Sequence, residues 1–360
     1  MIKTIPEGKF QHIEFKPTVP RNSLYVKSPL GLILFDRNGF SIYSKTTNKL
    51  LYNLDVLLEE FQCSESSIII EKPDLSYWIM TFKHSLIPKE EIKLIEEKSI
   101  IKCTFMTTGE FEYPFFALQE TEENLKLFDV RTGQDLLKEN NITVPKHPYK
   151  NFMLSKKYFV IRTDNTDYVS RFVFRTLNMK EKPYEIITND DHRSFLSENI
   201  LFIYYTLNDC FTVIECHHLD TQTVLKVNIP FTSIRSINES FIDSFDITSP
   251  IKIYEWNSSL TNLKLLIDLK CGNSLLNCFS KHLPFYVLSE TEDIEPDLDF
   301  WDTTKRVPLF IRVYSKTKGN MLIEYKISEF VNIFTDGVSR IYYKHHDNNE
   351  TKIGIIDFYC

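Results

Sequence analysis

A strand-turn-strand unit that recurs along the chain is the feature that most constrains its fold. In its clearest copy, residues 125–137, an alternating apolar strand pattern runs into a polar turn at Thr132 and a second strand pattern follows. Residues 42–46 and 313–317 are nearly the same pentapeptide at opposite ends of the chain. The turn threonines are Thr46, Thr132, Thr176, Thr221 and Thr317, at successive intervals of 86, 44, 45 and 96 residues. A fixed period near 44 residues predicts an array of similar small sheets.

The two long intervals are close to double periods, so each is expected to contain a divergent unit. Residues 77–82 lead into 91–95 in the first interval, and residues 251–256 lead into 263–267 in the second. These units bring the count to seven. Short helices are possible at 56–61 and 88–97, and the second of these competes with the strand at 91–95.

The two ends of the chain are expected to form one unit of the repeat together. Residues 352–360 look like one more third strand, but the chain stops where its turn would begin. Residues 10–16 alternate suitably and could supply the missing outer strand, which would leave no exposed sheet edge between the termini. Counting this composite unit gives eight, while the short unit near Tyr77 leaves seven open.

The copy around Thr132 resembles the end of a WD repeat. Phe128 and Asp129 stand where that family has Trp-Asp, and Arg131, Thr132 and Gly133 form the turn that follows. The resemblance implies an all-β fold: one β-propeller domain over residues 1–360, with seven or eight four-stranded blades. The N-terminal strand would close the ring by pairing with the C-terminal blade. Only 9 glycines occur, so most turns must use Asn, Asp and Lys-Thr.

Composition narrows the compartment and the partners. The net charge of −7 argues against a protein whose whole surface binds the phosphate backbone of nucleic acids. Seven scattered cysteines do not suggest a disulfide framework, and no apolar run has the length of a signal peptide or a membrane span. We therefore expect a protein of the cytoplasm, the nucleus or both, with no membrane partner.

An acidic segment, residues 289–306, interrupts the repeat and is expected to be an inserted loop. Its simplest interpretation is a solvated loop. The alternative is a peptide-like hook for a basic, apolar pocket on a partner protein, since acids surround two aromatic residues. Its candidate partner-binding residues are Glu295, Asp297, Asp299, Phe300, Trp301 and Asp302. A calcium site is disfavoured because the spacing of an EF-hand loop is missing.

Motifs for chemistry are not found. Cys210, Cys216 and the pair His217-His218 suggest zinc, but on one strand the two cysteines would lie about 20 Å apart. We expect buried structural histidines there and predict no metal and no cofactor. Because the chain also lacks a nucleophile elbow and a glycine-rich phosphate loop, we expect no catalytic activity.

Three functions stay open from the sequence. The first is a protein-interaction scaffold or adaptor subunit of a multiprotein complex, which is common among WD-repeat proteins. The second is a non-catalytic, RNA-associated subunit of a nucleic-acid-modifying complex, because the first 55 residues contain eight Lys or Arg and four Asp or Glu. The third is a propeller hydrolase with a site in the central channel. The resemblance implies the fold more directly than it implies any of these functions.

Overall fold

The computed structural model describes most of the chain and contains little besides β-strands. The described residues are 11–26, 28–86, 90–102, 108–121, 124–142, 152–164, 170–188, 193–207, 211–230, 233–237, 240–245, 251–257, 259–269, 274–279, 285–291, 308–315, 321–326, 332–335, 340–347 and 350–358. Within them the only helix is α1 (Leu136–Glu139). None of their helical structure is long and apolar enough to cross a membrane.

The strands form eight antiparallel four-stranded sheets, here called blades 1 to 8 in chain order. Blade 1 contains β2 (Ser23–Tyr25), β3 (Leu32–Asp36), β4 (Gly39–Tyr43) and β5 (Leu50–Asp55), and blade 2 contains β6 (Glu60–Ser64), β7 (Ser67–Glu71), β8 (Ser76–Ser85) and β9 (Glu91–Lys102). Blade 3 contains β10 (Thr108–Glu112), β11 (Phe115–Thr121), β12 (Asn124–Asp129) and β13 (Gln134–Asp135), and blade 4 contains β14 (Phe152–Leu154), β15 (Tyr158–Asp164), β16 (Ser170–Thr176) and β17 (Tyr184–Thr188).

Blades 5 to 8 continue the same strand order. Blade 5 contains β18 (Arg193–Ser197), β19 (Ile200–Leu207), β20 (Phe211–His218) and β21 (Thr223–Pro230), and blade 6 contains β22 (Ser233–Ile237), β23 (Phe241–Phe245), β24 (Ile251–Trp256) and β25 (Leu263–Leu269). Blade 7 contains β26 (Ser274–Phe279), β27 (Phe285–Thr291), β28 (Pro308–Ser315) and β29 (Met321–Lys326), and blade 8 contains β30 (Asn332–Thr335), β31 (Arg340–Asp347), β32 (Glu350–Asp357) and β1 (Gln11–Phe15).

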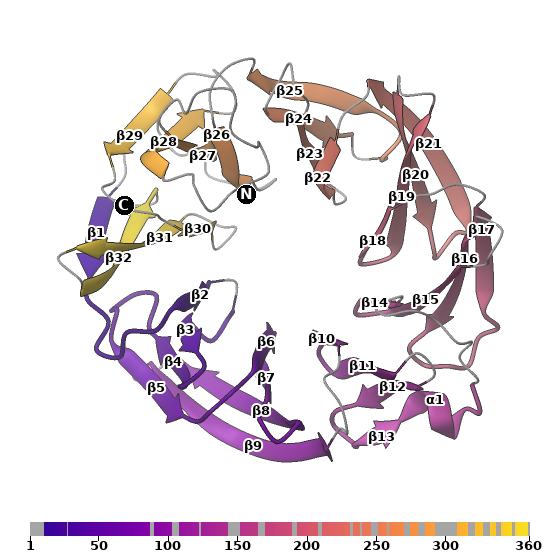
Figure 1. Cartoon of the computed structure of the whole chain (residues 1–360), viewed down its shortest axis with the longest axis horizontal. Coiled ribbons are helices and arrows are strands. Elements are labelled where there is room, and N and C mark those ends of the chain that lie inside the picture. Colours follow the sequence, from indigo (N-terminus) through magenta and orange to yellow (C-terminus); the bar gives the residue numbers. More distant parts are fainter. Residues whose placement is uncertain are drawn as a thin grey trace.

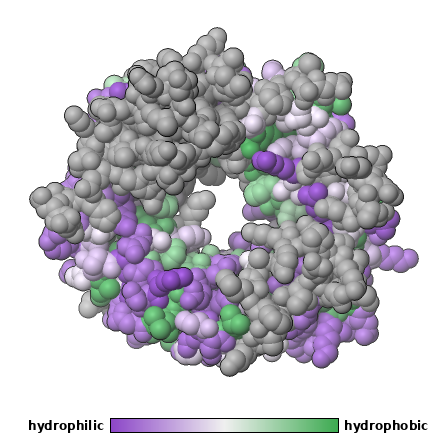
Figure 2. All heavy atoms as spheres, in the orientation of Figure 1, coloured by the Kyte–Doolittle hydropathy of each residue, from purple (hydrophilic) through white to green (hydrophobic). Residues whose placement is uncertain are grey.

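The blades are arranged as a ring around a central opening, with the first strand of each blade innermost and the fourth at the outer edge (Figure 1). The opening is still present when all heavy atoms are drawn as spheres (Figure 2). The predicted all-β propeller is confirmed, and its blades number eight rather than seven.

The recurring turns connect the third and fourth strands of the blades. Thr46 lies between β4 and β5, Thr132 between β12 and β13, and Thr221 between β20 and β21, while Thr176 ends β16. Thr317 lies outside the described residues. The two divergent units are β8 with β9 and β24 with β25, so the double intervals each contain one whole blade.

One alternative is decided by the structure and one local prediction is wrong. The outer strand predicted at 91–95 is confirmed, and the competing helix at 88–97 does not form in its described part, because Glu91–Lys102 pairs along the whole length of β8 and this pairing overrides a weak helical pattern. The outer strand after Thr132 has only two residues. There the Asp135 carboxylate accepts hydrogen bonds from the backbone N–H groups of Leu137 and Lys138, and this N-cap starts α1.

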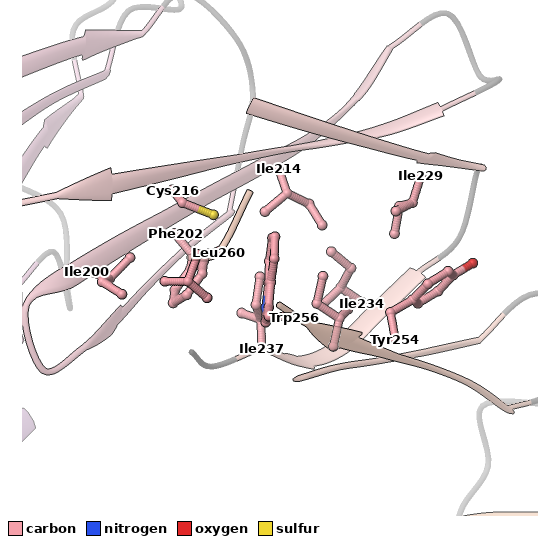
Figure 3. Close-up of a cluster of buried hydrophobic side chains, with 11 residues drawn as sticks. Ile200, Phe202, Ile214, Cys216, Ile229, Ile234, Ile237, Tyr254, Trp256 and Leu260 are labelled. Atoms are coloured by element: carbon pink, nitrogen blue, oxygen red, sulfur yellow. The ribbon is translucent and has the colours of Figure 1, made fainter. Parts of the chain in front are cut away.

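Neighbouring blades are held together by the alternation of side chains along each strand. On β19, Phe202 packs toward blade 6, while Leu201 and Ile203 pack toward blade 4. Figure 3 shows the cluster between blades 5 and 6, in which Trp256 lies among isoleucines of both blades. Similar clusters join blades 1 and 2, 2 and 3, 3 and 4, 4 and 5, 7 and 8, and 8 and 1.

Blade 8 is built from both ends of the chain. Strand β1 pairs antiparallel with β32, from Gln11 opposite Asp357 to Phe15 opposite Ile353. The predicted pairing of the N-terminal strand with the C-terminal blade is therefore confirmed. Blade 8 also contacts blade 1 directly, because the Lys344 ammonium donates to the Asn22 carbonyl oxygen at 2.7 Å.

Candidate interaction surface

The acidic segment that the sequence singled out, residues 289–306, lies mostly outside the described residues. Strand β27 ends at Thr291 and β28 begins at Pro308, and the residues between them lie outside the described part of the chain. This includes Glu295, Asp297, Asp299, Phe300, Trp301 and Asp302, so their role in partner binding stays a prediction.

Strand direction divides the ring into two faces. Because the strands of each blade are antiparallel, the turn between the first and second strands and the turn between the third and fourth strands lie at the same end of the blade. We call the face formed by these ends the paired-turn face. Two surface cavities are lined by turn residues of this face.

The larger cavity, here called the rim groove, lies between the outer strands β5 and β9 and has a volume of about 490 Å³. Its lining residues are Thr47, Lys49, Leu50, Leu51, Glu90, Glu91, Ile92 and Lys93. Leu50 is 39% exposed at the start of β5, and Ile92 is buried beneath the opposite wall. The groove therefore has an apolar floor bordered by lysines and glutamates.

Glu90 fixes one end of the rim groove. Its carboxylate accepts hydrogen bonds from the hydroxyl groups of Ser44, at 2.5 Å, and Thr46, at 3.2 Å, which belong to the turn of blade 1. The His84 ring nitrogen lies 3.3 Å from the other carboxylate oxygen. These contacts tie the third-to-fourth turns of blades 1 and 2 together, so the groove is preformed.

The second cavity lies between blades 4 and 5 and has a volume of about 290 Å³. Its centre is Asp220, which accepts hydrogen bonds from Lys157, from the Tyr158 hydroxyl at 2.5 Å and from the Asn199 amide at 2.8 Å. The hydrogen bond from Lys157 is the main reason that the pKa of Asp220 is lowered to about 2. Burial, followed by the bond to Asp220, raises the pKa of Tyr158 to about 12. An ionised carboxylate with three donors makes this cavity a structural junction between two blades.

The histidines expected to be structural lie in blade 5. His217 is 6% exposed, its Nε2 atom lies 3.1 Å from the Glu215 carboxylate, and the same carboxylate accepts a hydrogen bond from Lys226 at 2.9 Å. The contact with His217 is the largest cause that lowers the pKa of Glu215 to about 2. Cys210 lies outside the described residues. Among those that are described, no three His, Cys, Asp or Glu side chains are arranged to hold a metal ion.

Exposed apolar side chains recur on the outer strands of the ring. Those on fourth strands are Leu50, Ile95, Ile187, Val224, Leu265 and Met321. Figure 2 shows separate hydrophobic patches among hydrophilic surface on the described part of one face. Leu50 and Ile95 belong to β5 and β9, the two strands that border the rim groove.

Several basic residues near the N-terminus are neutralised by carboxylates. Arg21 is almost fully buried and pairs with Asp36 at 3.1 Å and Asp55 at 2.6 Å. On the surface, Lys16 pairs with Glu350 and Arg37 pairs with Glu59. The excess of positive charge in the first 55 residues therefore does not form a free basic patch at these positions.

Comparison with known proteins supports the fold. No family profile matches the chain, and no curated protein is significantly similar to it in sequence. Among solved structures, it is similar to the computationally designed Ika8 protein, with a TM-score of 0.54, 11% identity and coverage of 94% of this chain and 98% of the other.

Two natural proteins are similar over nearly their whole length. The WD40 domain of SCAP from fission yeast has a TM-score of 0.53 at 9% identity, covering 97% of this chain and 98% of the other. BamB from Moraxella catarrhalis has a TM-score of 0.50 at 8% identity, covering 96% and 98%. Fold and comparisons together define an eight-bladed β-propeller whose architecture is similar to that of a WD40 domain. At these identities they establish the architecture and not a function.

The rim groove was not found from the sequence. Its walls come from strands that begin about 40 residues apart and meet only because successive blades pack side by side. One local signal is available in retrospect: Leu50 directly follows the polar turn at 44–49, where a solvated turn would favour a polar residue.

Proposed function

We propose that this chain is a non-catalytic scaffold or adaptor subunit that binds one or more proteins in an intracellular complex, in the cytoplasm, the nucleus or both. The rim groove is the observation that carries the proposal. It combines an apolar floor with both signs of charge at its borders, and it is held open by the contacts of Glu90. These are features of a protein-binding surface, where an apolar centre is surrounded by polar groups.

The groove is one part of the surface that a partner would cover. A stable interface buries about 800 Å² on each side, so a partner seated there would extend along β5 and β9. Exposed Leu50 and Ile95 offer apolar contact in that direction. The two described free cysteines agree with a non-catalytic role, because burial raises the pKa of Cys63 to about 11 and that of Cys216 to about 12. Such thiols are protonated at neutral pH and are poor nucleophiles.

The test is affinity purification of the tagged chain from its own source, with quantitative mass spectrometry of three variants. Wild type is compared with Leu50→Asp, which places a charge at the groove, and with Ile187→Asp, which makes the same change on the distant outer strand β17. Thermal melting checks that all three are folded. A specific partner should be recovered with wild type and the Ile187 variant, and its affinity for the Leu50 variant should fall about tenfold, as expected for one lost apolar anchor.

Two results would count against the proposal in different ways. If the chain is recovered alone in every case, the scaffold function fails. If the Leu50 variant retains the same partners at wild-type affinity, the rim groove is not the binding surface.

A further inference from the structure

Strand β1 lies at the outer edge of blade 8 and is largely exposed. Gln11, His12 and Glu14 are exposed, and the apolar residues Ile13 and Phe15 are only half-buried. Besides the ladder with β32, Ile13 and Phe15 pack against the margin of the core between blades 8 and 1, with 5.9 Å between the ring centroids of Phe15 and Tyr43. The remaining side-chain contacts of the segment are polar. His12 contacts the Tyr343 hydroxyl, Glu14 lies 3.3 Å from the His345 ring, and Lys16 pairs with Glu350 at 2.5 Å.

The chain becomes firmly fixed to blade 1 just after β1. The backbone N–H of Val19 donates to the Tyr43 hydroxyl at 2.8 Å, and that hydroxyl donates back to the Val19 carbonyl oxygen at 3.2 Å. Two residues later, the Arg21 guanidinium is buried and bonded to Asp36 and Asp55. Residues 16–18, of which Pro17 is buried, form the short connection between the edge strand β1 and this firmly held segment.

Blades 1 and 8 remain in contact without β1. Their shared core contains the buried residues Leu24, Val26, Leu32, Leu34, Tyr43, Tyr342, Ile353 and Ile355, none of which belongs to β1. The Lys344 ammonium bonds to the Asn22 carbonyl oxygen, and the Arg340 guanidinium bonds to the Lys45 carbonyl oxygen. Release of β1 would therefore leave the ring joined and would expose the outer edge of β32.

An open edge at β32 is a template for a new strand, since its backbone groups need partners. A second copy of the chain carries a strand that fits this edge in every position. It would restore the ladder, bury Ile13 and Phe15 again, and remake the contacts of His12, Glu14 and Lys16. Reciprocal exchange closes a symmetric dimer, so both edges are covered.

We propose that the outer edge of β32 is a strand-binding site and that a second copy of this chain fills it with its own β1, giving a strand-exchanged dimer. The intramolecular strand competes at an effective concentration on the order of millimolar, as expected for a short connection. The exchanged form is therefore a minority at low protein concentration and grows as the concentration rises. Exchange requires only local opening of β1, because the rest of the ring stays joined.

The register of the ladder provides a direct test. Ile13 lies opposite Ile355, so their side chains point to the same side of the sheet. One preparation carries Ile13→Cys, the other carries Ile355→Cys, and the two are mixed under native conditions and oxidised. A covalent heterodimer is expected, in an amount that rises with protein concentration. The matched control replaces the second chain by one carrying Met321→Cys, an exposed residue of the outer strand β29.

Wild type oxidised under the same conditions shows how much covalent dimer the native cysteines form by themselves. A heterodimer no more abundant than in the Met321 control, at every concentration, would overturn the proposal. Melting curves of each cysteine variant show that the chains compared are folded.

A second variant tests the same idea without new cysteines. Deleting Pro17 and Thr18 shortens the connection by two residues, so β1 should no longer reach its own β32 in the observed register, while the strand of a second copy can still pair there in that register. The hinge-deleted chain should be a dimer by light scattering. If it is monomeric and melts like a chain that lacks residues 1–16, the edge of β32 does not take a strand from another copy and the proposal is wrong.

Discussion

Gly354 occupies a position where even one methyl group should disturb the closing blade. It lies on β32 opposite Tyr343 of β31 and Glu14 of β1. A Cβ atom at Gly354 would be 2.0 Å from Cζ and 2.4 Å from Cε1 of the Tyr343 ring. The ring is buried and stacks on His12 with 5.9 Å between ring centroids, so it has little room to move. The substitution Gly354→Ala therefore forces Tyr343 out of its place.

The expected cost follows from the clash. Gly354 is not among the residues with positive φ, so its backbone accepts any side chain and only the steric conflict counts. Overpacking of a core costs about 1–3 kcal/mol. For a chain of 360 residues, an unfolding entropy of about 2 cal/mol/K per residue converts this to a decrease in Tm of about 1–4 °C.

A double-mutant cycle measured by calorimetry separates this cause from others. The cost of Gly354→Ala should largely disappear when Tyr343 is first replaced by Ala, because the clashing ring is gone. Gly133→Ala is the matched control: Gly133 has a φ of 74° and no atom within 4 Å of an added Cβ, so its cost arises from the backbone alone and is independent of Tyr343. Equal costs of Gly354→Ala with and without the Tyr343 ring would refute the steric explanation.

Three further measurements address other parts of the ring. Removal of residues 1–16 eliminates the apolar contacts that Ile13 and Phe15 make with the core between blades 8 and 1, so the free energy of unfolding should fall by about 2 kcal/mol, and a peptide of residues 8–18 should restore it; unchanged denaturant midpoints would contradict this. Because the pKa of Glu215 is lowered from 4.5 to about 2, its contribution is complete above about pH 4.5 and is lost as the pH falls toward 2. The stability difference between wild type and Glu215→Gln should therefore shrink over that interval, and a constant difference would argue against the ion pair. Since burial raises the pKa of Cys63 to about 11 and that of Cys216 to about 12, iodoacetamide at pH 8 should modify both much faster in urea than in the native chain, as peptide mass spectrometry would show.

The blade arrangement could be predicted from the sequence because similar turns recur at a regular interval, a signal that a single strand does not provide. The threonine turns located the boundary between third and fourth strands, and the missing turn after the last strand indicated the composite blade. The sequence left a helix at 88–97 open beside the strand at 91–95, because the apolar residues Ile92, Leu94 and Ile95 fit more than one period. Pairing of β9 with β8 decides between these periods, and pairing is a contact between distant segments.

The candidate surface could not be predicted for a related reason. Thr47 and Leu50 line one side of the rim groove, and Glu90 and Ile92 line the other. They come together through the packing of blade 1 on blade 2, whose register depends on buried residues such as Phe40 and Phe82. The residue pattern within one repeat can indicate only one wall of the groove, because the other wall belongs to the next repeat.

On the inner and middle strands that the structure describes, most apolar side chains pack between blades; Phe195, Leu207 and Phe211 of blade 5 are exposed exceptions. On β19, successive residues serve opposite neighbours: Leu201 and Ile203 face blade 4, and Phe202 faces blade 6. The fourth strands are different, because their outward side chains face water and the fold would be equally well satisfied by polar residues. An exposed apolar residue alone is common on fourth strands of this ring, as at Ile187 and Val224. Leu50 differs because it also lines the preformed rim groove, and Ile95 lies on β9, which borders the groove. The search for a partner therefore begins at β5 and β9.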